Sequence, residues 1–484
     1  MQLGSTVLAL FVLICFAEAT QPGFGADADA HAISAGTVIK GCALPYSTVP
    51  AHVFYVDPVH GSMRNNGSSS APWRTLEEVV KSGLISTRRY DIQPYKPGAG
   101  LQPQNPKGVV HAGDMILLRS GNHGAVSIVG GVNHDFITIA AEKGQTPILS
   151  QLSLKGSSKW VFKGLTIQNT KIMLGKFSNL VEFLNHKFWG PTDNIIFEKN
   201  NVNSQQDVSM WTQQDWLNQS IFGAINDGAT CVTIRDNVLR NIGNGMFIGG
   251  DNALVEGNKI DNFGDDAIDI VASHIILRGN KITNNHDIGD GNHNDGIQGW
   301  TTGGLTNRDI LIEDNTIIAS MDPTLPFPGN IQGISIFDGK WLNVWIINNV
   351  VIVNAWHGIS LYGIQNAVII NNTVMGSNPD HTTWIGIFNM KTGELPINNV
   401  VRNNIAPTYI LKTSGISSAD HNVIASDPQT LFVDFDIAHA HYDLHLLPGS
   451  VATGEGDAYD APHTDNDGHV RVLPIDAGAY SSAK

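Results

Sequence analysis

The sequence predicts an all-β chain, a single-stranded right-handed parallel β-helix in which short strands wind into a solenoid. From about residue 194 onward one pattern recurs: two or three apolar residues, a polar pair that ends in asparagine, and another apolar residue. These units are short, rich in β-branched residues and bounded by Asn, Gly and Asp, which is typical of strands between tight turns. Self-similarity at a period of this length indicates a solenoid.

The recurring asparagines give the length of one coil. Neighbouring members are separated by 36, 21, 22, 35, 34, 23 and 32 residues. The shortest intervals define the bare coil and exclude propeller blades, which need about forty residues each. Asn tolerates the left-handed backbone of a sharp corner and its amide can bond to the Asn of the next coil, so we expect a stacked ladder. The predicted ladder is Asn201, Asn237, Asn258, Asn280, Asn315, Asn349, Asn372 and Asn404.

The two ends of the chain carry a family resemblance. Residues 54–58, 71–76 and 113–121 resemble the N-terminal region of bacterial, secreted pectin-lyase-like β-helix proteins. Residues 442–444 and 474–480 look like the terminal coil of the same superfamily. This resemblance covers nearly the whole mature chain and implies the fold rather than the substrate.

The resemblance also implies how the chain is organised. We expect one β-helix domain over residues 20–484, beginning with a cap at about 50–120. A short helix from Leu76 to Leu84 would close the open end of the core within that cap. Regular coils would follow at about 120–425 and a closing segment at about 426–484.

The first nineteen residues have the features of an export signal. An apolar stretch at 7–16 precedes Ala17-Glu18-Ala19, the small-x-small pattern after which signal peptidase cuts, and it is too short to span a bilayer. We therefore expect a secreted or periplasmic protein with no membrane association after cleavage. Of three cysteines, Cys42 and Cys231 would remain, and two distant cysteines are expected to be free buried thiols.

Charge limits the choice of partner. The net charge of -15 and a charged fraction of 15% make nucleic acid and anionic membranes poor partners. A polyanionic substrate would need a local positive field, such as a bound cation. We expect a monomer that acts on a polysaccharide.

A second pattern follows the first in each coil: a polar residue, Gly or Ala, an apolar residue and a variable residue. Because side chains alternate along a strand, Ile268 and Ile270 are expected to point into the core. Ala267, Asp269 and Val271 would then point outward. Stacked coils give a turn ladder and a strand ladder on one face, which are Asn244, Asp266, Asp295, Gln332 and His357, and Asp269, Gln298, Ser335 and Ser360.

Two insertions are expected to wall the groove along this face. Residues 284–294 precede the strand of Asp295, and the Pro-rich residues 321–330 precede the strand of Gln332. Loops on a rigid scaffold are where binding groups concentrate. Trp300, Phe337, Trp341 and Tyr362 would supply flat surfaces for sugar rings. The predicted substrate-binding residues are Gln298, Trp300, Gln332, Ser335, Ser360 and Tyr362.

Seven acidic or histidine residues gather on two successive coils, and this convergence predicts a functional centre. Neighbouring coils lie about 4.8 Å apart, so Asp266 and Asp295 are expected to form a carboxylate pair. Taken alone, Asp265-Asp266 would only cap a turn. The seven residues are Asp265, Asp266, Asp269, Asp287, Asp290, His293 and Asp295.

One predicted chemistry is glycoside hydrolysis, which needs a general acid and a second carboxylate. Asp266 and Asp295 resemble the active-site layout of polygalacturonases. Another is β-elimination on uronic acids, which needs a base and a group that neutralises the substrate carboxylate. Asp265-Asp266-x-x-Asp269 has the spacing seen in the calcium site of certain β-helix pectate lyases, which implies Ca²⁺ and no organic cofactor.

The lyase is favoured over the hydrolase, because seven such residues exceed what a two-carboxylate mechanism needs and a cation would offset their repulsion. The predicted catalytic residues are Asp266, Asp295, His293, Lys340 and His357, and the predicted metal ligands are Asp265, Asp266, Asp269, Asp287 and Asp290. A uronate epimerase is an alternative, although its expected Asp-Pro-His motif is absent from the groove coils. A non-catalytic glycan-binding β-helix is a further alternative, which would need the aromatic residues but not the acidic cluster.

Overall fold

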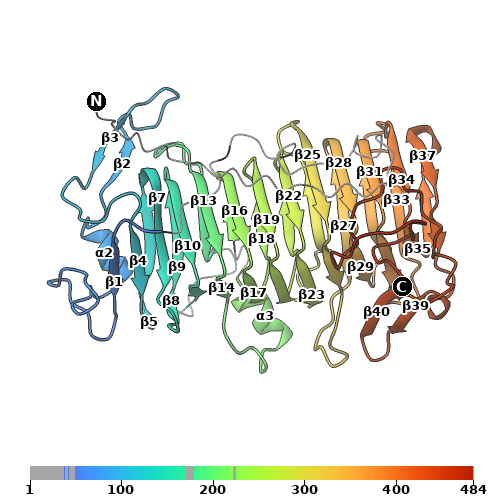
Figure 1. Cartoon of the computed structure of the whole chain (residues 1–484), viewed down its shortest axis with the longest axis horizontal. Helices are drawn as coiled ribbons and strands as arrows, with labels where there is room; N and C mark the ends of the chain where they lie inside the picture. Colours follow the sequence, from blue (N-terminus) through green and yellow to red (C-terminus); the bar gives the residue numbers. More distant parts are fainter. Residues whose placement is uncertain (1–37, 39–41, 43–48, 170–178, 222–224, 483–484) are drawn as a thin grey trace, which may run out of the picture.

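The computed structural model describes residues 38, 42, 49–169, 179–221 and 225–482, and these form a right-handed parallel β-helix (Figure 1). Each regular coil contributes one strand to each of three long sheets, as β19, β20 and β21 do in the middle of the chain. The coils stack in chain order from the blue N-terminal end to the red C-terminal end of Figure 1. The predicted fold class is confirmed.

Sheet 1 is the fifteen-stranded sheet among the described residues. Its parallel strands are β1 (Val53–Val56), β4 (Met115–Leu118), β7 (Val132–Ala141), β10 (Ser158–Lys163), β13 (Asp193–Glu198), β16 (Thr230–Arg235), β19 (Ala253–Glu256), β22 (Ile275–Arg278), β25 (Thr306–Glu313), β28 (Lys340–Ile347), β31 (Gln365–Ile370), β34 (Asn399–Arg402) and β37 (Ile416–Asp420). An antiparallel pair joins them at the N-terminal end, β2 (Thr87–Tyr90) and β3 (Leu101–Gln104).

Sheet 2 follows sheet 1 around each coil. Its twelve described strands are β5 (Gly121–Asn122), β8 (Pro147–Leu149), β11 (Thr166–Gln168), β14 (Asn201–Asn203), β17 (Val238–Ile242), β20 (Lys259–Phe263), β23 (Lys281–Asn285), β26 (Thr316–Ile318), β29 (Val350–Val353), β32 (Thr373–Gly376), β35 (Ile405–Ala406) and β38 (Val423–Ile424).

Sheet 3 completes the coil and carries the second sequence pattern. Its eleven described strands are β6 (Ala125–Val129), β9 (Gln151–Lys155), β12 (Val181–Leu184), β15 (Ile225–Asp227), β18 (Met246–Ile248), β21 (Ile268–Ile270), β24 (Asn294–Trp300), β27 (Ile331–Asp338), β30 (His357–Tyr362), β33 (Trp384–Phe388) and β36 (Thr408–Leu411).

The interior is a stack of apolar side chains in register. Ile268 pairs with Ile297, Ile297 with Ile334, and Ile334 with Ile359, and all four are fully buried. Equal spacing lets identical side chains pack on one another from coil to coil. The inward orientation predicted for Ile268 is confirmed. Ala267 is also fully buried in the core, so its predicted outward orientation is wrong.

A buried asparagine ladder occupies the corner between sheets 1 and 2. Asn237 donates from Nδ2 to Asn258 Oδ1 at 2.9 Å and to the Phe197 carbonyl at 3.0 Å. Its backbone N–H also donates to Asn258 Oδ1 at 3.0 Å. The bonds satisfy corner backbone groups that would otherwise be buried without partners. The ladder runs through Asn200, Asn237, Asn258, Asn280, Asn315, Asn349, Asn372, Asn404 and Asn422.

The predicted ladder is therefore confirmed except at its first member. Asn200 is buried and bonds to Asn237, whereas Asn201 is exposed at the start of β14. The left-handed backbone lies one residue earlier than each ladder position, at Lys199 (φ 58°) and Asp236 (φ 55°), for example. The ladder residue itself supplies the amide rather than the corner conformation.

Short elements close both ends of the solenoid. Helix α2 (Leu76–Lys81) is shorter than expected, begins after the N-cap Thr75, and buries Leu76 and Val79 against the first coils.

A second helix, α3 (Gln213–Gln219), lies in the segment between β14 and β15. The single-turn elements η2 (Thr413–Gly415) and η3 (Pro428–Thr430) lie near the C-terminal end.

The C-terminal segment differs from the expected terminal coil. β39 (Phe432–Asp436) and β40 (His441–Leu446) form an antiparallel hairpin, at the lower right of Figure 1. Apolar residues of this hairpin pack against outward-facing residues of sheet 2 such as Ile352, because those side chains would otherwise be exposed. Farther on, the buried Arg471 donates to Asn348 Oδ1 at 2.8 Å and so binds the segment to the ladder corner.

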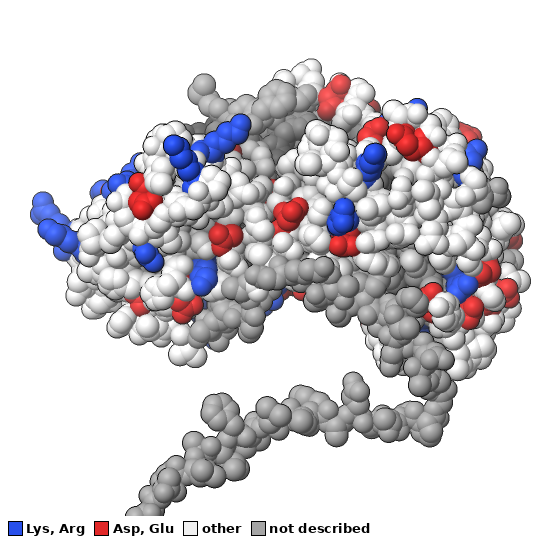
Figure 2. Space-filling view, turned by 90° about the horizontal axis from the view of Figure 1, so that it is seen from above, with Lys and Arg blue, Asp and Glu red and all other residues white. Residues whose placement is uncertain are grey.

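Cys42 and Cys231 are joined by a disulfide, so the expectation of two free thiols is wrong. The bond ties residue 42 to β16, 189 residues along the chain. The predicted export signal at residues 1–19, including Cys15, lies outside the described residues. None of the helices in the described ranges is long and apolar enough to cross a membrane. Figure 2 shows a face on which acidic and basic side chains lie scattered over a mainly uncharged surface.

The ladder assignment can be tested by comparing two adjacent asparagines. We expect Asn200→Ala to lower the free energy of unfolding by about 2–3 kcal/mol, because it leaves buried backbone groups without partners. Asn201→Ala, at the exposed neighbouring position, should change it by less than about 0.5 kcal/mol. Thermal denaturation of both variants measures the difference. Equal losses would contradict the assignment.

Candidate functional site

One outward-facing column of side chains runs along sheet 3 from β6 to β30. Asp269 pairs with Gln298, Gln298 with Ser335, and Ser335 with Ser360, as the strand ladder predicted. The pairing continues toward the N-terminus from Asp269 to Phe247 and then to Asn226, Glu182, Ser153 and Ser127. The alternation of strand side chains thus lines up polar groups from successive coils on one face.

A second column lies at the turn that enters sheet 3. Asp295 pairs with Gln332, and His357 with Trp384. Asp266 occupies the same position one coil before Asp295, because the Ala267 N–H donates to the Asp295 carbonyl at 2.9 Å. The predicted turn ladder is confirmed at these positions.

Four carboxyl groups from two adjacent coils form a buried cluster, which we call the carboxyl cluster: Asp265, Asp266, Asp269 and Asp295. Their exposed fractions are 7%, 5%, 4% and 0%. Asp266 Oδ1 accepts a hydrogen bond from the Asp295 backbone N–H at 2.7 Å. Oδ1 of Asp269 and Oδ1 of Asp295 are both buried and have no hydrogen-bond partner, which makes them candidates to meet a ligand.

Amide side chains hold the cluster from both sides. Asn244 Nδ2 donates to Asp269 Oδ2 at 3.0 Å, and Asn292 Nδ2 donates to Asp265 Oδ1 at 2.8 Å. Gln298 Nε2 donates to Asp295 Oδ2 at 3.1 Å. The role of Asn292 was not predicted, because its insertion shows no repeat.

Burial keeps protons on the cluster. It raises the pKa of Asp265 to about 6 and that of Asp269 to about 7, and nearby carboxylates add to both shifts. Burial, with the charges of its neighbours, also raises the pKa of Asp266 well above its ordinary value. Near neutral pH the cluster therefore includes protonated, proton-donating carboxyl groups.

Two histidines beside the cluster are driven in opposite directions. His293 Nδ1 lies 2.8 Å from Asp295 Oδ2, and this hydrogen bond raises the pKa of His293. Burial, with the charge of His293, lowers the pKa of His357 to about 4. His357 Nδ1 lies 2.9 Å from Ser360 Oγ. Near neutral pH, His357 is thus neutral, while His293 retains its proton to a higher pH than an ordinary histidine.

An aromatic row extends from the cluster toward the C-terminal coils. The Phe337 ring lies 5.0 Å from that of His357 and 5.2 Å from that of Tyr362, and Tyr362 stacks on Phe388 at 4.8 Å. On the other side Trp300 lies 6.1 Å from Phe247. Such partly exposed rings offer flat apolar surfaces. We define the aromatic row as Phe337, His357, Tyr362, Trp384 and Phe388.

The structure changes the predicted set of aromatic residues. Trp341 is only 1% exposed and packs in the core, so its predicted sugar-facing role is wrong. It follows Gly339 into sheet 1 and there points inward, with Nε1 donating to the Asp338 carbonyl at 3.1 Å. Trp384 was missed, although it occupies the turn position equivalent to His357.

Three insertions, one more than expected, meet beside the cluster. The two predicted loops pair through His286 and Pro328, and the Asp287 N–H donates to the Phe327 carbonyl at 2.7 Å. Trp216 of α3 stacks on His286 with ring centroids 4.4 Å apart. These contacts agree with the prediction that both loops lie beside the site. The contact made by α3 could not be predicted from the sequence, because this helix lies in a segment outside the repeat.

Two lysines have different relations to the site. Lys340, a candidate base together with His293 and His357, was expected at the end of the Ser335 strand, but it is exposed at the start of β28, which belongs to sheet 1. Lys391 was not predicted, because it lies on the loop after β33. Its Nζ pairs with Asp338 Oδ2 at 2.9 Å, lies 5.8 Å from the centre of the Phe337 ring and contributes positive charge felt by His293.

The predicted calcium ligands do not all come together. Asp287 and Asp290 instead accept hydrogen bonds from backbone N–H groups of their own loop, at 2.8 and 3.0 Å. Within the described ranges, no three His, Cys, Asp or Glu side chains are arranged to hold a metal ion. The five-residue donor set therefore does not fit a preformed cation site, and Ca²⁺ binding stays a prediction.

Comparison with known proteins identifies the fold. Residues 220–424 match a family described as a right handed beta helix region. The fold implied by the pectin-lyase-like resemblance is confirmed. A comparison with curated proteins finds no match.

Solved structures show likeness in fold only. Pectate lyase Pel9A is 14% identical over 90% of this chain and 97% of that chain, with a TM-score of 0.41. The A-module of mannuronan C-5 epimerase AlgE6 from Azotobacter vinelandii is 14% identical over 64% and 91%, with a TM-score of 0.45. GH136 lacto-N-biosidase from Eubacterium ramulus is 12% identical over 77% and 68%, with a TM-score of 0.34.

The raised pKa of Asp269 predicts a pH-dependent effect on stability. Below about pH 4 the carboxyl is protonated in both folded and unfolded chains, so it has no effect. As pH rises toward about 7, the unfolded chain releases the proton more readily, and the folded state loses relative stability. Asp269→Asn should therefore raise Tm by a few degrees at pH 8 and leave it nearly unchanged at pH 4.

The control is Asp287→Asn, whose carboxylate is exposed. In differential scanning fluorimetry, we expect the Tm of this variant to differ from the wild-type Tm by the same amount at pH 4 and at pH 8. A Tm of Asp269→Asn that is lower than the wild-type value at pH 8 would contradict the burial argument.

Proposed function

We propose that the protein is a carbohydrate-active enzyme that cleaves a uronic-acid-containing polysaccharide by β-elimination on the outer face of sheet 3. The observation that supports this most is the joint presence of protonated carboxyl groups, a neutral histidine and positively charged groups on one face of sheet 3. These are three kinds of group that the reaction needs.

The proposed proton transfers use residues of the site directly. His357 accepts the proton from the carbon beside the substrate carboxylate, because its low pKa keeps it neutral. The electron pair of that C–H bond forms a carbon–carbon double bond, and the glycosidic C–O bond breaks. A protonated carboxyl of the cluster, at Asp269, donates its proton to the leaving oxygen. One product then ends in a hydroxyl group and the other in an unsaturated sugar, and no water is consumed.

Positive charge is supplied at the same place. His293, with its raised pKa, and Lys391 would offset the negative charge of the substrate carboxylate. The aromatic row would support the sugar rings through their apolar faces. In this arrangement His293 and Lys391 neutralise the substrate carboxylate and the aromatic row binds the sugar rings, so no step uses a metal.

Glycoside hydrolysis is the second candidate. The raised pKa of Asp295 and its contact with His293 also suit a general acid that protonates a glycosidic oxygen. A second carboxyl of the cluster would then act as base or nucleophile.

We also propose a secreted or periplasmic location for the mature protein. The disulfide between Cys42 and Cys231 supports it, since structural disulfides form and persist in oxidising compartments.

The two chemistries differ in their products. We expect wild-type protein incubated with polygalacturonate or alginate to generate the ultraviolet absorbance of an unsaturated sugar. Asp266→Asn and Asp295→Asn should each lower kcat at least about 100-fold without loss of folding. Reducing ends formed without absorbance would replace the lyase by the hydrolase, and loss of turnover in EDTA would support the cation. Full activity in both variants would refute the site.

The pKa values predict a bell-shaped pH profile. Activity should rise as pH passes about 4, where His357 loses its proton, and fall above about 7, where Asp269 loses its own. Initial rates from pH 3 to pH 9 measure this. A rate that keeps increasing to pH 9 would contradict protonated carboxyl groups as proton donors.

Charge recognition can be assigned to one lysine. Lys391→Gln should raise KM for a uronate polymer about two- to fivefold with little change in kcat, because the lost contact is exposed. Lys340→Gln is the matched substitution, and we expect neither parameter to change, since Lys340 lies on sheet 1. A large loss of kcat in Lys340→Gln would instead identify Lys340 as the base.

A further inference from the structure

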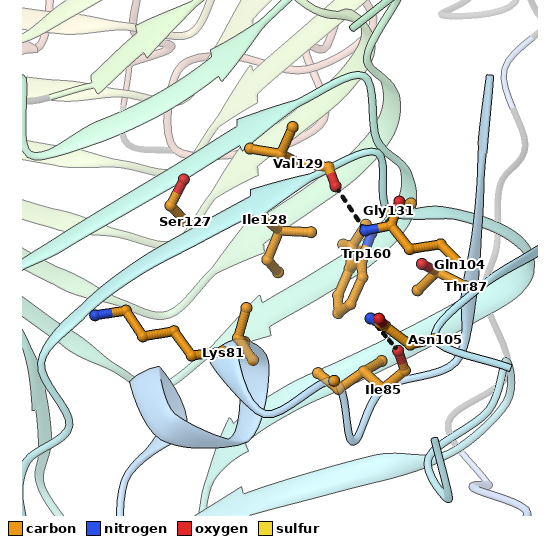
Figure 3. A pocket seen from close by; sticks show the side chains of 12 residues that line it. Lys81, Ile85, Thr87, Gln104, Asn105, Ser127, Ile128, Val129, Gly131 and Trp160 are labelled. Carbon is orange, nitrogen blue, oxygen red and sulfur yellow. Dashed lines mark hydrogen bonds between the residues drawn. The ribbon is translucent and has the colours of Figure 1, made fainter. Parts of the chain in front are cut away.

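A cavity of about 280 Å³ lies at the N-terminal end of sheet 3 (Figure 3). It opens to the surface between β6 and the N-terminal cap, where the end of helix α2 and the following Gly83, Ile85 and Thr87 form one wall. Gln104 and Asn105, at the end of β3, form another. Its volume is at the lower end of the range of small-molecule sites.

The cavity presents polar atoms beside apolar surface. Gln104 Nε2 donates to the Val129 carbonyl at 3.0 Å, and Asn105 Nδ2 donates to the Ile85 carbonyl at 3.2 Å. These two bonds fix both amides and do not use their side-chain oxygens. The indole of Trp160 lies between the two amides and β6 in Figure 3, and it is itself held by a 2.7 Å bond to the Gly131 carbonyl.

The cavity is in line with the carboxyl cluster. Ser127 lines the cavity and is also the first member of the outward column that reaches Asp269. Five strand pairings separate these two residues, which corresponds to roughly 24 Å along the helix axis at the spacing of neighbouring strands. The intervening members are polar except for Phe247, and Ser153 Oγ donates to Glu182 Oε2 at 3.1 Å.

We propose that this cavity binds a sugar unit of the same polysaccharide, several units away from the bond that is cleaved. A sugar ring has hydroxyl groups on its edge and apolar C–H groups on its faces, which matches fixed amide oxygens beside the partly exposed apolar side chains of Val80 and Val129. A chain that lies along sheet 3 over the carboxyl cluster reaches the cavity if it continues toward the N-terminal coils. This inference rests on the proposed polysaccharide substrate but not on the proposed reaction.

The test compares affinities for chains of graded length. Binding of oligogalacturonides and, separately, of neutral cello-oligosaccharides is measured by titration calorimetry in an Asp295→Asn background, in which cleavage does not interfere. Ser127→Ile fills the cavity from an exposed strand position that accepts a β-branched residue. Ala125→Ile is the matched control, exposed on the same face of β6 but outside the cavity.

We expect Ser127→Ile to weaken binding of long oligogalacturonides about tenfold and to leave short oligogalacturonides unchanged, with the cello-oligosaccharides as the neutral comparison. Ala125→Ile should bind both as the parent does. Equal affinity of Ser127→Ile and parent for long chains, an equal loss for short chains, or no binding of either series would overturn the proposal. If the wild-type protein cleaves neither polymer but Ser127→Ile still loses long-chain affinity, the cavity proposal stands and the proposed reaction fails.

Discussion

The asparagine ladder is the interaction on which the rest of the structure depends. Each ladder amide bonds to the amide of the next coil and to a carbonyl of an earlier one, so a coil cannot shift along the axis or slip by one residue without breaking several buried bonds. A slip of one residue would also turn every side chain of sheet 3 to the opposite face. The position of Asp269 over Gln298 is therefore set at a corner that neither residue touches.

The repeated part of the chain was predictable because its geometry follows from a two-residue alternation and a nearly constant coil. Those two facts place Asp269, Gln298, Ser335 and Ser360 in one column without knowledge of any loop. Asn201 was chosen over Asn200 because the two asparagines are adjacent in the sequence. They are distinguished only by the left-handed residue that directly precedes each ladder position, which here is Lys199. The residue that directly follows this left-handed position is Asn200.

The parts that were missed depend on contacts between segments far apart in the chain. Cys42 reaches Cys231 across 189 residues, and nothing in the local sequence of either cysteine records this. Lys391 reaches Phe337 from a loop whose path is set by no repeat. Trp341 was misplaced because the chain enters sheet 1 directly after Gly339, so that Trp341 is an inward-facing residue of β28 and not an extension of sheet 3. Solenoid physics fixes the coil and leaves its insertions free.

The disulfide has a consequence for how such a molecule would come apart. In a solenoid each coil contacts only its neighbours, so unfolding ordinarily begins at either end and proceeds coil by coil. A covalent link from residue 42 to β16 closes the N-terminal half into a loop, and its first coils cannot be carried away from the middle of the stack. The C-terminal half has no such link within the described residues and is held by non-covalent contacts, among them those of the hairpin and of Arg471. The carboxyl cluster, one and two coils beyond that of β16, lies near the boundary between a tethered half and a half that is free to unwind.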